Sequence, residues 1–105
     1  MRMSNIERML KVYLWFTSVL DEKGYPFYYY SGPFPFRLLS WEASIETITI
    51  ISRELRGLGS VPVRWPDDCF RELNGIRILE SNAVPDGKIA LCYDGDRLRV
   101  LMDLV

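Results

Sequence analysis

Two turn signals near the C-terminus constrain the fold more than any other feature of this sequence. Pro85-Asp86-Gly87 and Asp94-Gly95-Asp96 each place a glycine where a tight turn needs a positive φ. The segments around these turns, residues 76–84, 88–93 and 97–104, are apolar or alternate apolar with polar residues. Alternation is typical of a strand with one buried face. The sequence therefore predicts a three-stranded antiparallel meander at the C-terminal end.

A helix is predicted near the N-terminus. Ser4 and Glu7 have the spacing of a capping box, in which each side chain satisfies a backbone amide of the first turn. Gly24 is the expected stop. Apolar residues recur at helical spacing between these points, at Ile6, Met9, Leu10, Tyr13, Phe16 and Leu20.

The middle of the chain predicts two more helices. Ser40 is the expected cap of a helix over residues 41–56, with acidic residues early and arginines late, although the β-branched residues within it also suit a strand. A short third helix is expected from Pro66 to Asn74. Residues 1–105 then form a single α+β domain, in which two N-terminal helices and a short third helix pack on a small antiparallel sheet ending in the meander.

Composition argues against an enzyme. The chain has no histidine, which removes the usual general base and the commonest metal ligand. Asp94 and Asp96 with Glu80 or Asp86 supply too few spaced oxygen ligands for calcium, so no metal and no cofactor are predicted. Cys69 and Cys92 lack the spacing of a zinc or redox motif and could form a disulfide only if the fold brings them together.

Charge and hydropathy favour a cytoplasmic protein without a membrane segment. The net charge is −1, so no global field draws the chain to nucleic acid or anionic lipid. The apolar stretch at residues 12–20 is too short to cross a bilayer, and Glu7 and Lys11 precede it. The absence of glutamine follows one trend reported for thermophiles.

The aromatic segment at residues 25–36 is the first candidate binding site. Prolines break it too often for a helix, so we expect a short edge strand at residues 27–30 and an ordered loop beyond it. Three consecutive tyrosines cannot all point inward, whereas the phenylalanines suit a core as well as a surface. Tyrosine and tryptophan concentrate at protein interfaces. The predicted partner-binding residues are Tyr28, Tyr29, Tyr30, Phe34, Phe36 and Trp41.

A second candidate site consists of arginines on the predicted sheet. Arg77, Arg97 and Arg99 would share one face if the strands pair as a meander. Beside exposed tyrosines, they would form a platform for single-stranded nucleic acid. Solvated strand residues opposed by Glu80 and Asp103 are the simpler interpretation.

Residues 75–91, a strand, a Pro-Asp-Gly turn and a strand, locally resemble a segment of tailed-phage coat proteins, which implies a viral or mobile-element source. The function predicted from the residues themselves is that of a small non-enzymatic accessory protein. It would bind a protein partner or a second copy of itself, forming a homo-oligomer, through the aromatic segment. The alternative is a single-stranded nucleic-acid-binding module.

Overall fold

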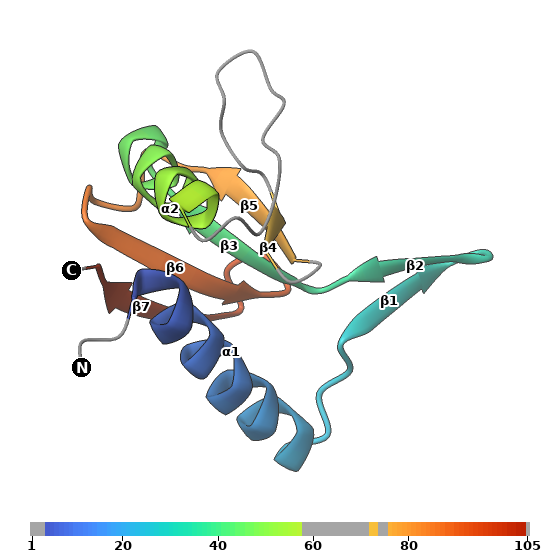
Figure 1. Ribbon diagram of the computed structural model, residues 1–105. Helices are drawn as coiled ribbons and strands as arrows, with labels where there is room; N and C mark the ends of the chain where they lie inside the picture. The colour runs from blue at the N-terminus through green and yellow to red at the C-terminus, as the bar shows by residue number, and fades with distance from the viewer. Residues whose placement is uncertain (1–3, 58–71, 74–75, 105) are drawn as a thin grey trace.

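The computed structural model describes residues 4–57, 72–73 and 76–104, and these form an α+β fold with two separate sheets (Figure 1). The larger sheet has five strands in the order β4-β5-β3-β6-β7, and the smaller sheet is the two-stranded hairpin β1-β2. The elements are α1 (Asn5–Glu22), β1 (Tyr28–Ser31), β2 (Phe34–Arg37), β3 (Leu39–Ala43), α2 (Ile45–Gly57), β4 (Glu72–Leu73), β5 (Ile76–Glu80), β6 (Lys88–Tyr93) and β7 (Leu98–Asp103).

The first helix is found where the sequence predicts it. Ser4 is the N-cap, its hydroxyl accepts from the Glu7 amide at 3.1 Å, and the Glu7 carboxylate accepts from the Ser4 amide at 3.3 Å. Gly24 follows the helix with a φ of 74°. The amide of Ile6 also donates to Glu54 Oε1 at 2.7 Å, which connects the start of α1 to α2.

The predicted meander is wrong, because β3 lies between β5 and β6. It pairs parallel with β5 and antiparallel with β6, whereas β6 and β7 form the expected hairpin. The segment after β5 bonds to β3 and α2. The Pro85-Asp86-Gly87 turn does form, with the Lys88 amide donating to the Pro85 carbonyl at 3.2 Å, but it leads into β6 and does not make a hairpin of β5 and β6. Ser81 donates from its amide to the Ala43 carbonyl at 2.9 Å, and the Gly87 amide donates to Thr47 Oγ1 at 3.1 Å. Residues 81–87 therefore carry the chain across β3.

The second helix begins later than predicted. Ser44 caps it by accepting from the Thr47 amide at 3.3 Å, and residues 41–43 belong to β3. Trp41 is buried between Ile78 on β5 and Leu91 on β6, its cross-strand neighbours. The alternating burial of Leu39, Trp41 and Ala43 outweighs the helical spacing, because β5 and β6 pair with β3 on both sides and the helices cover its inner face.

The third predicted helix is only partly testable. Most of it lies outside the described residues, but its last part, Glu72–Leu73, forms β4 and pairs antiparallel with β5. In the parts of the chain that the structure describes, there are two helices, and neither is long and apolar enough to cross a membrane.

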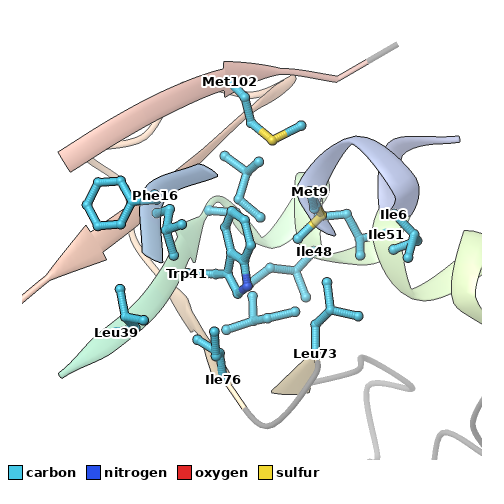
Figure 2. Close-up of a cluster of buried hydrophobic side chains, with 14 of the residues drawn as sticks. Ile6, Met9, Phe16, Leu39, Trp41, Ile48, Ile51, Leu73, Ile76 and Met102 are labelled. Carbon is cyan, nitrogen blue, oxygen red and sulfur yellow. The ribbon is translucent and has the colours of Figure 1, made fainter. Parts of the chain in front are cut away.

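Both helices cover the same face of the larger sheet. Trp41 lies within a cluster to which α1 contributes Met9 and Phe16, α2 contributes Ile48, and β7 contributes Met102 (Figure 2). We call the opposite side the open face. It carries the alternate strand residues, among them Ser40, Glu42, Arg77, Leu79, Arg99 and Leu101.

Candidate functional site

The aromatic segment forms a hairpin that extends away from the larger sheet (Figure 1). Its strands β1 and β2 pair antiparallel from Tyr28 opposite Arg37 to Ser31 opposite Phe34. Gly32 and Pro33 form the turn, and Gly32 takes a φ of 62° that favours glycine. The edge strand expected at residues 27–30 is close to β1, whereas the loop expected beyond it contains β2.

The hairpin presents aromatic side chains on both faces. Tyr29, Phe34 and Phe36 share one face by the pairing register, and Tyr28 and Tyr30 share the other with Arg37. These five aromatic side chains are 41–66% exposed. On the second face, the Tyr28 and Tyr30 rings lie 6.5 Å apart, and the Arg37 guanidinium lies 5.7 Å from the Tyr28 ring centre. The three side chains described on the face with Tyr29, Phe34 and Phe36 are all aromatic, and we call it the aromatic face.

Contacts at its base fix the hairpin to the larger sheet. The Tyr93 hydroxyl donates to the Pro26 carbonyl at 2.7 Å, and the Tyr93 ring stacks on Tyr25 at 5.7 Å. The Arg97 guanidinium lies 5.3 Å from the centre of the same Tyr25 ring. Burial raises the pKa of Tyr93, so its hydroxyl keeps the proton that it donates.

A pocket of about 420 Å³ lies between this base and the aromatic face. Asp94 and Arg97 stand at its polar side, with a carboxylate oxygen and a guanidinium nitrogen 3.9 Å apart. The remaining lining is mostly aromatic or aliphatic and comprises Pro26, Tyr28, Tyr29, Phe36, Leu38 and Tyr93. Such a lining suits an apolar or aromatic group with one polar contact.

Trp41 does not belong to this surface. Its side chain is 1% exposed and lies in the core under α1 and α2, so its prediction as a partner-binding residue is wrong. The aromatic segment and Trp41 are close in sequence, but β3 turns Trp41 toward the helices.

The three arginines do not share one face. Arg77 and Arg99 alternate with buried or partly buried strand residues and so lie on the open face. Arg97 lies instead over Tyr25 and lines the pocket. Arg77 also faces Glu72 across β4 and β5, and Arg99 faces Cys92. The predicted platform of three arginines beside tyrosines is therefore not assembled.

The described residues give no metal site, since no group of three or more potential ligands gathers among them. Asp94 and Arg97 close the turn after β6 through a 3.4 Å backbone hydrogen bond. Cys92 is a free, buried thiol, and Cys69 lies outside the described residues. Burial, helped by the neighbouring Glu42 carboxylate, raises the pKa of Cys92 to about 12, which disfavours the reactive thiolate.

Sequence reasoning missed Tyr93 as a residue of the hairpin base. It named Arg97 for a sheet face and included Tyr25 in the aromatic segment, but did not predict that these two residues meet. Tyr93 ends an apolar strand, and the hydroxyl of a buried tyrosine usually needs a hydrogen-bond partner. The sequence could therefore have predicted that this hydroxyl bonds to another part of the chain. Its partner, the Pro26 carbonyl, depends on the fold.

Comparison with known proteins adds no relative. No protein-family model matches the chain, no curated protein matches it, and no solved structure matches it.

Proposed function

We propose that this chain is a non-enzymatic accessory protein that binds another protein chain through the hairpin β1-β2. One observation carries the proposal: Tyr28, Tyr29, Tyr30, Phe34 and Phe36 are 41–66% exposed on an element that stands apart from the core. Large aromatic side chains grouped on a protruding element are typical of a binding surface.

The energy available from covering these rings is substantial. A buried aromatic side chain removes about 150–250 Å² from water, so a half-exposed ring leaves roughly 100 Å² uncovered. At about 25 cal/mol per Å², covering each ring contributes roughly 2–3 kcal/mol before the cost of association. A few such rings are enough to anchor a partner.

The chemistry of the hairpin also indicates the kind of surface that it binds. Residues 24–36 contain no aspartate, glutamate, lysine or arginine. Arg37 is the one charged residue of the hairpin strands, so a highly charged partner surface would lose its hydration here and could form an ion pair at this single position. The complementary surface is therefore apolar, and the pocket at the hairpin base can accept one of its side chains.

Photo-cross-linking tests this proposal. A photoreactive phenylalanine analogue replaces Tyr29 in one variant and Arg53, an exposed residue of α2, in the control. Both proteins are irradiated in purified form at several concentrations and in the cells that express them. We expect protein adducts from position 29 and few from position 53. Equal yields from both positions, or adducts from neither, would overturn the proposal.

The geometry favours the nucleic-acid alternative less, because Arg77 and Arg99 are on the open face, away from the tyrosines that would stack with bases, and of the three predicted arginines Arg97 alone lies beside them. The cytoplasmic location and the viral or mobile-element source stay predictions from the sequence.

A further inference from the structure

The outer edge of β1 has backbone groups that pair with no strand among the described residues. Leu38 donates from its amide to the Phe27 carbonyl at 2.9 Å, which makes Phe27 and Leu38 a hydrogen-bonded pair at the base of the hairpin. Bonded and non-bonded pairs alternate along antiparallel strands. By the observed register, the backbone amides and carbonyls of Tyr28 and Tyr30 therefore point away from β2. No strand in the described part of the chain pairs with this edge.

The outer edge of β2 differs because Pro35 lies on it. Pro35 is opposite Tyr30, so its nitrogen also points outward, and this nitrogen has no hydrogen to donate. Proline at such a position is a common way to block strand addition. The hairpin thus has one blocked edge and one edge that can accept another strand.

We propose that the outer edge of β1 pairs antiparallel with β1 of a second copy of this chain, joining the two hairpins into a four-stranded sheet. This inference rests on the proposed function and specifies its partner and its binding mode. In the symmetric register, Tyr28 exchanges backbone hydrogen bonds with the partner's Tyr30, and Tyr29 lies opposite the partner's Tyr29. Blocked β2 edges end the sheet on both sides, so the assembly closes as a dimer.

The second copy fits because the surface is complementary to itself. Residues 24–36 carry no acidic or basic side chain, and Arg37 lies on β2, one strand away from the pairing edge, so the two β1 edges meet without like charges between them. A two-stranded hairpin is at best marginally stable alone, and a sheet of more strands is stabler. The uncovered parts of Tyr28, Tyr29 and Tyr30, the rings on the pairing strand, amount to roughly 300 Å² per copy and about 600 Å² for two. That area is below the size of a standard stable interface, so a weak, reversible dimer is expected.

Sedimentation velocity over a concentration series tests the pairing with two variants at one position. Tyr30→Pro removes the outward amide hydrogen while leaving the hydrogen bonds within the hairpin in place. Tyr30→Val is the matched control, because it removes the same ring and keeps the amide hydrogen. We expect the wild type to dimerise, Tyr30→Val to dimerise more weakly because it lacks the ring, and Tyr30→Pro to do so at least about tenfold more weakly than Tyr30→Val. Circular dichroism checks that both variants are folded.

Disulfide trapping tests the register. Across a non-bonded antiparallel pair, the Cα atoms lie about 4.5 Å apart, within the range that a disulfide spans. Under mild oxidation, Tyr29→Cys should give a covalent dimer, Phe34→Cys on the same face should give much less, and the wild type controls for the native thiols. Equal trapping at positions 29 and 34 would overturn the register.

The outcomes separate this inference from the proposed function. A wild type that stays monomeric at every concentration, or a Tyr30→Pro variant that associates as strongly as Tyr30→Val, overturns the edge pairing. In either case, photo-cross-linked adducts from position 29 would still support protein binding by the hairpin. Absence of those adducts overturns both.

Discussion

The hydroxyl of Tyr93 donates a hydrogen bond to the carbonyl oxygen of Pro26 at 2.7 Å, across the gap between the last residue of β6 and the segment that enters the hairpin. This bond joins the rigid sheet to the candidate binding element. The buried Tyr93 ring also stacks on Tyr25. The hairpin is therefore held at its base while its aromatic side chains stay exposed.

Removing this hydroxyl should loosen the hairpin. Tyr93→Phe deletes the donor and leaves the Pro26 carbonyl without its partner, which should cost about 1 kcal/mol in the free energy of unfolding. Urea denaturation measures the cost, and hydrogen exchange should show faster exchange at hairpin amides. Tyr30→Phe, at an exposed position, is the control and should change neither quantity. Unchanged hairpin exchange in Tyr93→Phe would show that the bond does not hold the base.

Truncating Trp41 should destabilise the fold strongly, whereas truncating Trp15 should hardly change its stability. Trp41 is 1% exposed in the core, whereas Trp15 on α1 is 56% exposed. Trp41→Ala should lower the free energy of unfolding by about 3–5 kcal/mol, because it leaves a cavity between the helices and the sheet. Trp15→Ala should change it by about 0.5 kcal/mol or less. Similar losses in the two variants, measured by denaturant titration, would contradict the position of Trp41.

Trp41 also shows where sequence reasoning reaches its limit. Residues 39–43 satisfy both a strand and a helix pattern, and the decision depends on β5 and β6, which come much later in the chain. By contrast, the N-terminal helix was correctly predicted because Ser4 and Glu7 carry a local signal that needs no distant partner. Local chemistry likewise predicted the turn between β6 and β7.

The strand order could not be predicted for the same reason. Pro85-Asp86-Gly87 is a valid turn signal, but residues 81–87 are long enough to cross a neighbouring strand, and their bonds to Ala43 and Thr47 are nonlocal. For the site, the consecutive tyrosines predicted exposure, because alternate strand residues face opposite sides. The pocket at the hairpin base joins residues 26–38 with residues 93–97, a contact that only the fold reveals.

Two carboxylates should show opposite dependences on pH. Asp86 raises the pKa of Glu46 by bonding to its protonated form and repelling its charged form. Because the pKa of Glu46 is raised in the folded state, this side chain stabilises the fold at low pH. The contribution is lost as the pH rises past the raised pKa. Asp86→Asn should therefore lower the pKa of Glu46 in a carboxyl NMR titration. It should also raise stability at pH 7, with a smaller gain near the ordinary glutamate pKa of 4.5.

Asp103→Asn is the control with the opposite sign. The hydrogen-bonded Lys88 ammonium lowers the pKa of Asp103, so this carboxylate stabilises the fold above its ordinary pKa of 3.8 and loses the effect as the pH falls. The variant should lose stability at pH 7 and approach the wild type in acid. Thermal unfolding across this pH range measures both variants, and a shared sign would contradict the two contacts.

Cys92 should resist alkylation in the folded protein. With its pKa raised to about 12, only about one thiol in ten thousand is ionised at pH 8, and the side chain is buried. Mass spectrometry of the peptide containing Cys92 after iodoacetamide treatment should show little label without denaturant and full label in guanidinium chloride. Rapid labelling of the folded chain would mean that Cys92 is not buried with Val84 and Ala90.

Hydrogen exchange measured residue by residue at low and high protein concentration tests most directly whether the hairpin is the association surface. The account predicts that backbone amides of residues 27–37 become protected as concentration rises, with Tyr28 and Tyr30 changing most. Amides on α2 and on the open face should keep the same rates. Protection gained on α2 or the open face, with the hairpin amides unchanged, would contradict the account.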